Sequence, residues 1–130
     1  MLFRSGTASE PWLLQVSSQK NDTRFLTEGE TDAMRLMSLG NPGDFIPYAM
    51  PSASWNPTPE QCYYIGAFRE VILCFDGDKA GRDATTRIAS LFKKHANGCK
   101  VYDLQIPDGK DCCDLTNEEL KKLIDGKREL

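Results

Sequence analysis

The sequence predicts an α/β domain with a roughly four-stranded parallel sheet flanked by helices. From residue 25 onward, short apolar runs alternate with stretches of helical periodicity, which is typical of parallel strands joined by helices. The 130 residues are enough for about one domain, and 40% hydrophobic with 27% charged residues is the balance of a globular fold. The chain therefore has enough apolar sequence for one modest core.

The first half of the chain predicts two strands around one helix. A short apolar run over 25–27 reads as a strand, and the stretch 31–39 has helical spacing with Gly40 as its stop. The run 45–48 is a weaker strand candidate, because Pro47 lacks the amide that a sheet ladder needs.

The second half predicts three helices and two strands, with clear start signals. The expected elements are a helix from about 58, a strand over 71–75, a helix over 82–95, a strand over 101–106 and a helix from 116 to 126. Thr58 with Gln61, and Thr116 with Glu119, have the spacing of helix capping boxes. The continuous apolar run 71–75 is typical of a strand buried on both faces.

The chain ends are harder to interpret. Residues 1–24 are expected to be an N-terminal extension or edge element, residues 25–126 the main domain and residues 127–130 a tail. The run 12–16 fits either an edge strand or the remnant of another subdomain. Trp55 lies in a polar loop, which makes it the aromatic residue most worth testing for base stacking.

Charge and hydropathy exclude several classes of protein. A net charge of −3 and a pI near 5.2 argue against a strongly basic nucleic-acid clamp. No apolar run approaches the roughly 20 residues of a membrane helix, and the first residues lack the apolar core of a secretory signal. The expected location is therefore the cytoplasm.

Cysteine and histidine content limits the chemistry. The five cysteines are odd in number and form no C-x-x-C pair, so a disulfide framework and a structural zinc site are poor interpretations. Cys112 and Cys113 have the residue type of a redox or metal-binding pair, but reduced thiols beside a loop are the favoured interpretation. His95 is the sole histidine, so the chemistry has to rely on carboxylates.

Three acidic clusters follow predicted strands. They are Glu28, the pair Asp76 and Asp78, and the pair Asp111 and Asp114. Ligands of open parallel sheets collect at the carboxyl ends of the strands, and oxygen ligands favour Mg²⁺ or Mn²⁺. Strand alternation would point Asp76 and Asp78 the same way. Taken alone, however, an Asp-Gly-Asp sequence is more often a solvated turn; the combination of three clusters carries the metal hypothesis.

The sequence resembles the Toprim domain, which primases, topoisomerases and several nucleases share. The matching segments are LTEGETDAM (26–34), VILCFDGDKAGRDAT (71–85) and GKDCCDL (109–115), in the family's order over about residues 24–116. The residues of these motifs are most similar to those of bacterial primases and phage-type primase-helicases. The resemblance implies that residues 25–126 form a Toprim-like catalytic domain.

The resemblance also implies roles for individual residues. Glu28 matches the glutamate that acts as general acid or base or as a metal ligand. The implied metal ligands are Glu28, Asp32, Asp76, Asp78, Asp111 and Asp114. The implied phosphate-binding residues are Lys79, Arg82 and Lys110. Two departures bear on the metal positions: no glycine follows the second strand, and Cys113 replaces an aspartate common in bacterial primases.

Three functions remain open. The first is primase-type synthesis of RNA primers in DNA replication, dependent on Mg²⁺ or Mn²⁺ and on partners or the rest of a longer chain. The second is a free-standing Toprim nuclease that cleaves DNA or RNA, and the third is a non-catalytic module that binds nucleic acid or a replication protein. The implied partners are single-stranded DNA template or RNA, nucleoside triphosphates and a helicase or another replication protein, in a bacterial or phage-infected cell and without a membrane.

Overall fold

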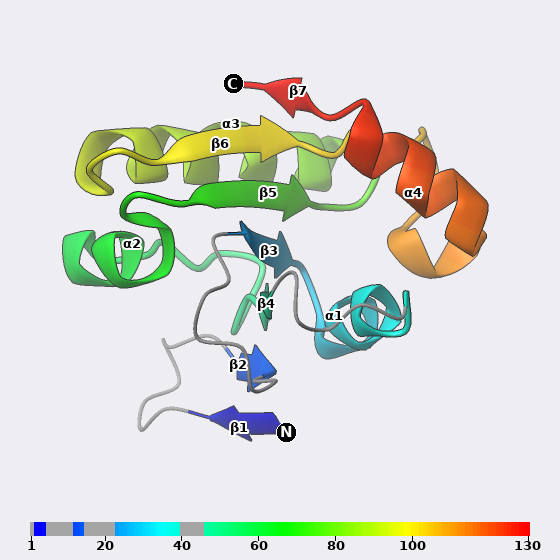
Figure 1. Ribbon diagram of the computed structural model, residues 1–130, viewed down its shortest axis with the longest axis horizontal. Coiled ribbons are helices and arrows are strands. Elements are labelled where there is room, and N and C mark those ends of the chain that lie inside the picture. The colour runs from blue at the N-terminus through cyan, green and yellow to red at the C-terminus, as the bar shows by residue number, and fades with distance from the viewer. Residues whose placement is uncertain (1, 5–11, 15–22, 40–45) are drawn as a thin grey trace.

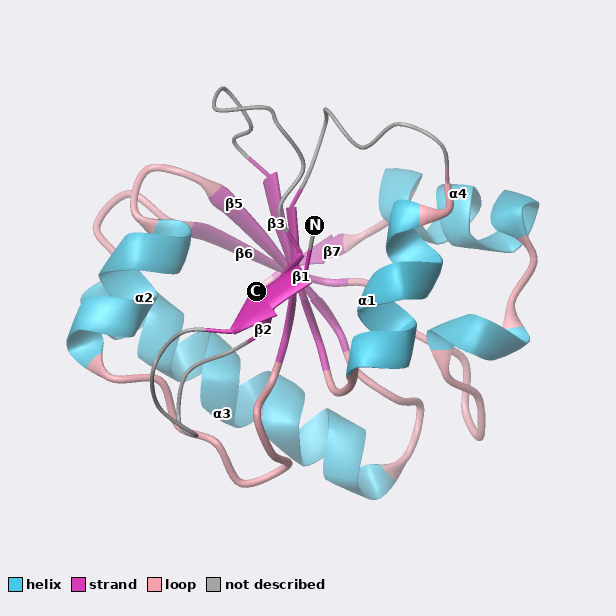
Figure 2. Ribbon diagram, turned by 90° about the horizontal axis from the view of Figure 1, so that it is seen from below, coloured by secondary structure: helices cyan, strands magenta, loops and turns pink. Residues whose placement is uncertain are grey.

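The computed structural model describes residues 2–4, 12–14, 23–39 and 46–130. Within this part of the chain, one twisted sheet runs through the middle of the molecule, with helices on both sides (Figures 1 and 2). None of the described helices is long and apolar enough to cross a membrane.

The described strands form one sheet with the order β1-β2-β4-β3-β5-β6-β7. Their bounds are β1 (Leu2–Arg4), β2 (Trp12–Leu14), β3 (Thr23–Thr27), β4 (Ile46–Ala49), β5 (Glu70–Cys74), β6 (Lys100–Asp103) and β7 (Arg128–Glu129). The four central strands β4, β3, β5 and β6 are parallel, whereas β1, β2 and β7 pair antiparallel. The predicted four-stranded parallel sheet is confirmed as the core of a wider mixed sheet.

The helices cover the two faces of the sheet. Their bounds are α1 (Glu30–Met37), α2 (Pro59–Gly66), α3 (Lys79–His95) and α4 (Asn117–Asp125), with a short 3₁₀ turn η1 (Cys112–Asp114) before α4. Helices α2 and α3 pack on one face, and α1, η1 and α4 pack on the other (Figure 2).

Strand alternation explains why the last four residues of β5, 71–74, are all apolar. Val71 and Leu73 join the core under α2 and α3, while Ile72 and Cys74 join the core under α1 and α4. Successive side chains of a strand point to opposite faces, so a strand covered on both faces has no polar position in its interior. The prediction of a strand buried on both sides is confirmed.

Both predicted capping boxes are present. The Thr58 side chain accepts from the Gln61 amide while the Gln61 side chain accepts from the Thr58 amide, and Thr116 and Glu119 repeat this arrangement before α4. These reciprocal bonds satisfy amides that the first turn of a helix leaves free.

Two element bounds differ from the sequence prediction by three residues. Helix α3 begins at Lys79 rather than Arg82, because the Asp78 carboxylate caps it and accepts from the Gly81 amide at 2.7 Å. Strand β6 ends at Asp103 rather than at residue 106. Gln105 has φ +65°, which breaks the extended backbone, and Asp103 Oδ1 accepts from its amide at 2.9 Å.

Some expectations for the ends and for Trp55 are corrected. Residues 12–14 join the sheet between β1 and β4 instead of lying at its edge, and residues 128–129 of the expected tail form β7. Trp55 is 5% exposed and packs in the core under α2 and α3, so this ring does not face solvent for base stacking. The predicted stop at Gly40 lies outside the described residues.

Candidate active site

The first two acidic segments meet at the carboxyl ends of β3 and β5. The parallel register pairs Thr27 with Cys74, so the chain leaves both strands at the same edge of the sheet, on the right in Figure 1. Glu28 Oε1 accepts a hydrogen bond from the Asp76 amide at 3.0 Å. Thr27 Oγ1 donates to the Gly29 carbonyl at 2.9 Å and thereby fixes the turn that carries Glu28.

Asp76 is the most perturbed carboxyl group at this edge. Burial together with the charges of Glu28, Asp32, Asp111 and Asp78, in falling order of effect, raises its pKa to about 7. Carboxylates that converge in this way repel unless a proton or a cation intervenes. The pKa shows that the structure brings four of the predicted acidic residues within electrostatic reach of Asp76.

Asp78 differs from Asp76 in its exposure and in its hydrogen bonding. It is exposed, and one of its carboxylate oxygens caps α3 through the Gly81 amide. Gly81 has to be a glycine here, because a Cβ at this residue would lie 2.0 Å from the Asp76 carbonyl oxygen. The Asp-Gly-Asp segment is therefore both the end of β5 and the start of α3.

Gly77 allows a second loop to approach the site. A Cβ at this residue would lie 1.9 Å from the Pro107 carbonyl oxygen. The Gly77 amide donates to the Lys110 carbonyl at 2.8 Å, and the Gly77 carbonyl accepts from the Gly109 amide at 2.7 Å. These two bonds hold the loop that carries Lys110 and the following Asp111 beside Asp76.

Asp32 lies in the first turn of α1 and contacts two thiols. Cys112 Sγ donates to Asp32 Oδ1 at 3.3 Å, and Cys113 Sγ donates to the same oxygen at 3.4 Å. Burial raises the pKa of Asp32 and outweighs the lowering by these donors. Burial and the bond to Asp32 also raise the pKa of Cys113 to about 12, so this thiol is protonated in the metal-free protein.

Asp111 and Asp114 form the capping box of η1. The Asp111 carboxylate accepts from the Cys113 amide at 2.8 Å and from the Asp114 amide, and Asp114 Oδ2 accepts from the Asp111 amide at 3.0 Å. Asp111 acts electrostatically on Asp76, whereas the Asp114 side chain is exposed to solvent.

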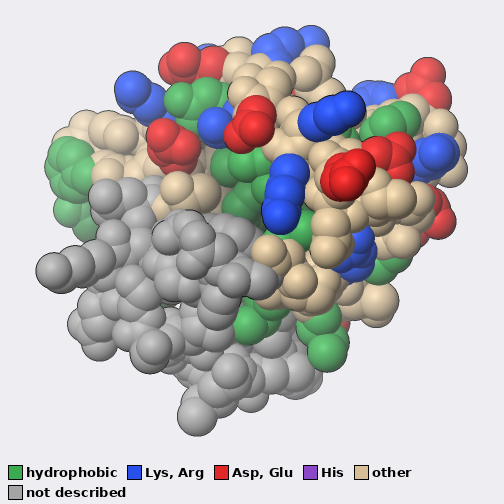
Figure 3. All heavy atoms as spheres, turned by 45° about the vertical axis from the view of Figure 1, so that its right-hand side comes forward, with side chains coloured by type: hydrophobic (Ala, Val, Ile, Leu, Met, Phe, Trp, Pro, Cys, Tyr) green, Lys and Arg blue, Asp and Glu red, His purple; other side chains and the backbone are tan. Residues whose placement is uncertain are grey.

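The predicted phosphate-binding residues are close in sequence to the acidic residues, since Lys79 follows Asp78 and Lys110 precedes Asp111. Lys79 pairs with Asp83 at 2.9 Å, and Arg82 binds Asp108 and the Ile106 carbonyl. Lys110 is exposed. Figure 3 turns the carboxyl ends of the strands forward and shows acidic and basic side chains interspersed on this face.

Sequence reasoning missed the contact between Asp32 and the two cysteines. It assigned Asp32 to the acidic centre and Cys112 and Cys113 to a loop, but the fold joins residues 80 positions apart through α1 and η1. The sequence signal was the Cys-Cys pair inside the segment 109–115, where the resemblance expects an aspartate.

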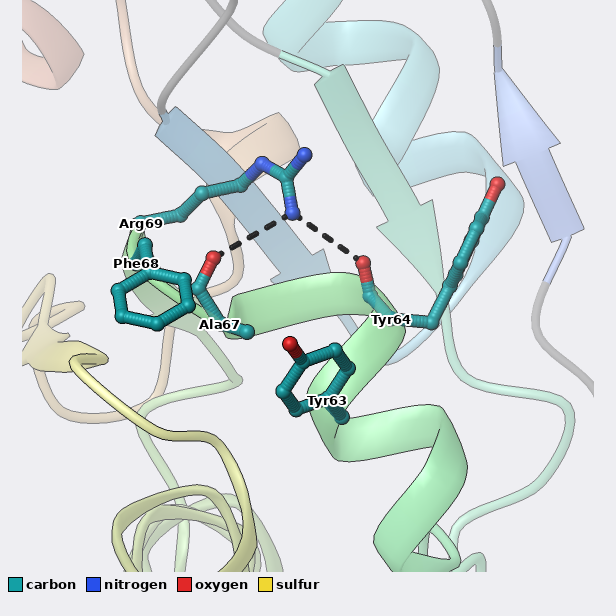
Figure 4. Close-up of a pocket in the computed structure, with 5 residues that line it drawn as sticks. All are labelled: Tyr63, Tyr64, Ala67, Phe68 and Arg69. Atoms are coloured by element: carbon teal, nitrogen blue, oxygen red, sulfur yellow. Dashed lines mark hydrogen bonds between the residues drawn. The ribbon is translucent and has the colours of Figure 1, made fainter.

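A hollow lies at the opposite end of the sheet. It is lined by Tyr63, Tyr64, Ala67, Phe68 and Arg69, and Arg69 donates to the carbonyls of Tyr64 and Ala67 (Figure 4). The rings of Tyr63, Tyr64 and Phe68 are all more than half exposed. Phe68 has φ +59°, a left-handed conformation that bulky residues rarely adopt.

The fold and this edge define a class: a parallel α/β domain with an acidic centre where its middle strands end. The chain belongs to the Toprim-like family, whose model matches residues 25–116. It is 30% identical over 106 residues to the DNA primase of Escherichia coli K12, which covers 80% of this chain and 17% of that protein. The chain thus spans less than a fifth of that relative's length.

Solved structures agree with this assignment. The Aquifex aeolicus primase, solved with its zinc-binding and RNA polymerase domains, matches 84% of this chain and 27% of its own with a TM-score of 0.66 and 28% identity. The primase fragment of the bacteriophage T7 primase-helicase matches 82% of this chain and 43% of its own, with a TM-score of 0.56. Its 22% identity supports the fold alone. The chain is therefore a Toprim-like domain similar to those of primases.

Proposed function

We propose that this chain is the catalytic domain of a primase-type enzyme that transfers nucleotides during RNA primer synthesis in DNA replication. The observation that carries the proposal is the acidic centre around Asp76, in a domain similar to those of primases. A half-buried carboxyl group with a pKa near 7, surrounded by further carboxylates, is characteristic of functional sites.

The donor set fits a hard divalent cation. Glu28, Asp76, Asp78 and Asp111 offer carboxylate oxygens, which suit Mg²⁺ and Mn²⁺. The repulsion that raises the pKa of Asp76 is the electrostatic cost that a cation would relieve. A bound cation would neutralise phosphate oxygens and activate the attacking hydroxyl. Asp32 and Asp114 are assigned as additional ligands of this set.

Glu28 is assigned to proton transfer as well as to metal binding. Its Oε1 is held by the Asp76 amide, which fixes the orientation of the carboxylate. Its other oxygen is left to hold the proton of the attacking 3′-hydroxyl, and a general base has to lie within hydrogen-bond reach of that proton.

The basic residues are assigned to phosphate binding. Lys79 and Lys110 are exposed, and Arg82 is tied to Asp108 at the surface. A triphosphate or template strand would compete with Asp83 and Asp108 for these side chains, because exposed ion pairs contribute little stability. The proposed partners are single-stranded DNA or RNA, nucleoside triphosphates and a helicase or another replication protein of a bacterial or phage-infected cell.

The test is a gel assay with the full chain. Single-stranded DNA carrying an annealed RNA primer, with both strands end-labelled, is incubated with nucleoside triphosphates and Mn²⁺ or Mg²⁺ at low salt. The variants are Glu28→Gln and, as a matched control, the exposed Glu60→Gln. Extended primers that disappear with Glu28→Gln alone support the proposal. Shortened products that disappear in the same way identify a nuclease and contradict it.

An unchanged substrate is resolved by a binding measurement on the same samples. Labelled ATP is titrated with Mn²⁺ present and absent, for the wild type and for the Asp76→Asn, Asp78→Asn double variant. Metal-dependent ATP binding that the double variant loses supports a primase-type domain that requires partners. ATP binding that is absent, or that is independent of metal, identifies a non-catalytic module and contradicts the proposal.

A further inference from the structure

Three side chains between α1 and η1 bring metal-ligating atoms together. Asp32 Oδ1 lies 3.3 Å from Cys112 Sγ and 3.4 Å from Cys113 Sγ, and all three atoms lie within 4.8 Å of one another. Two of the three are sulfur atoms. This set therefore differs in chemistry from the carboxylates around Asp76.

The sulfur–oxygen distances are within a few tenths of an ångström of those around a tetrahedral thiophilic cation. Bonds of about 2.3 Å to sulfur and about 2.0–2.2 Å to carboxylate oxygen at the tetrahedral angle separate sulfur from oxygen by about 3.5–3.7 Å. The two observed separations are 3.3 and 3.4 Å. A cation could enter with small side-chain movements as the two thiol protons leave. Cys113 is exposed, so the fourth position is open to water.

The surrounding contacts fix these ligands in advance. Arg35 Nη2 donates to the Leu115 carbonyl at 2.8 Å and ties α1 to the end of η1. Cys112 is 2% exposed and packs in the core with Leu36 and Cys74. Asp111 Oδ1 accepts from the Cys113 amide at 2.8 Å and holds the turn that carries both thiols. Ligands held this way need little ordering when a cation binds.

We propose that Asp32, Cys112 and Cys113 bind a thiophilic divalent cation, for which Zn²⁺ is the natural candidate, with water as the fourth ligand. Thiolates select such cations, whereas Mg²⁺ and Mn²⁺ favour oxygen ligands. The adjacent cysteines lack the C-x-x-C spacing by which zinc sites are recognised in a sequence. The proposal does not depend on the reaction assigned to the acidic centre.

Occupation of this site would act on the acidic centre through Asp32. Asp32 is one of the carboxylates whose charge reaches Asp76. A thiophilic cation would draw this carboxylate toward the two sulfur atoms and add positive charge beside Asp76. We therefore expect Zn²⁺ to weaken the binding of Mg²⁺ or Mn²⁺ at the neighbouring carboxylates.

The test uses Co²⁺ as a spectroscopic substitute for Zn²⁺. The reduced full chain is titrated with Co²⁺ in a large excess of Mg²⁺, and Zn²⁺ is then added in competition. The expected result is a thiolate-to-cobalt charge-transfer band with the visible bands of four-coordinate cobalt, which Zn²⁺ removes. Cys113→Ser should weaken Zn²⁺ binding at least about tenfold, since loss of an outer-shell partner alone can cost that much.

The controls separate this site from the acidic centre. Cys99→Ser removes a half-buried thiol beside the other core and should leave the spectrum unchanged. The Asp76→Asn, Asp78→Asn double variant should keep the thiolate band even where it loses Mg²⁺. A wild type without the charge-transfer band, or with the same Zn²⁺ affinity as Cys113→Ser, overturns the proposal.

Discussion

The two ends of the sheet have different unfavourable features: converging like charges at one end and exposed aromatic rings at the other. At the carboxyl end, like charges converge on Asp76 and raise its pKa to about 7. At the amino end, the rings of Tyr63, Tyr64 and Phe68 are exposed to water. The first is repulsion between carboxylates inside a half-buried site, which a bound cation would relieve, and the second is exposed apolar surface. Among the described residues of these two ends, only those at the carboxyl end therefore combine a raised carboxylate pKa with converging metal-ligating side chains.

The strongest test of this difference removes the repulsion between carboxylates. The Asp76→Asn, Asp78→Asn double variant should lower the affinity for Mg²⁺ or Mn²⁺ roughly 100-fold or more, the upper end of the effects of outer-shell partners. The fold should persist, because asparagine also caps helices. Calorimetric titration measures the affinity and circular dichroism the fold.

Asp83→Asn is the matched control for that experiment. Asp83 is an exposed carboxylate of α3 that pairs with Lys79, so its loss should leave metal affinity unchanged. Unchanged metal binding in the double variant, or an unfolded double variant, would show that the two carboxylates are structural.

The next test concerns the close approach at the carboxyl end. Gly77→Ala should lower the free energy of unfolding by about 2–3 kcal/mol, because the new Cβ collides with the backbone of Pro107. Urea denaturation measures it. Gly126→Ala is the control, because the nearest atom to its new Cβ is 3.4 Å away. Equal stability of the two variants would contradict the observed packing of the loop.

A smaller effect is expected in the pH dependence of stability. Because folding raises the pKa of Asp76 from 3.8 to about 7, the folded state holds this proton more tightly than the unfolded chain. Its stabilising contribution is complete below pH 3.8 and is lost as the pH rises through about 7. Asparagine has no such proton to lose. Metal-free Asp76→Asn should therefore melt at a higher temperature than wild type at about pH 8.

The quantity to compare is the difference in melting temperature between Asp76→Asn and wild type. The other titrating groups are the same in both proteins, so their effects cancel in this difference. Differential scanning calorimetry in a chelator should show the gap close by about pH 4. A gap that is constant with pH would mean that Asp76 does not titrate in this window.

The smallest effect is expected at the amino end. Phe68→Asn should change the free energy of unfolding by less than about 1 kcal/mol, toward higher stability, because asparagine tolerates the left-handed backbone better than phenylalanine. Little packing is lost, since the ring is 66% exposed. Urea denaturation measures the change in the free energy of unfolding, and Mg²⁺ titration measures the metal affinity of the same variant. A marked loss of metal affinity would contradict the separation of the two ends.

Local sequence signals predicted most of the fold. Both capping boxes and the apolar run 71–75 have physical causes that lie within a few residues, and all three are present in the structure. The predicted start of α3 was three residues too late, just after Gly81. Gly81 lies in the first turn of α3, where its missing Cβ leaves room for the Asp76 carbonyl oxygen. No local sequence pattern reveals this contact.

The candidate site was predictable only where strand ends fixed it. Glu28 and Asp76 follow adjacent parallel strands, so their proximity follows from the topology. The contacts of Asp32 with Cys112 and Cys113 depend on how α1 packs against η1, which the sequence does not state. Trp55 was misplaced for a similar reason, since its polar loop folds back over the core.

The pair of backbone bonds between Gly77 and the 107–110 loop also determines how this edge can move. With one bond on each side of Gly77, to Gly109 and to Lys110, neither segment can separate from the other without breaking both. The two segments should therefore open as one cooperative unit, and the amide hydrogens of Gly77 and Gly109 should exchange with solvent at similar rates. A contact made by Lys110 would then be transmitted through the main chain to the turn after Asp76.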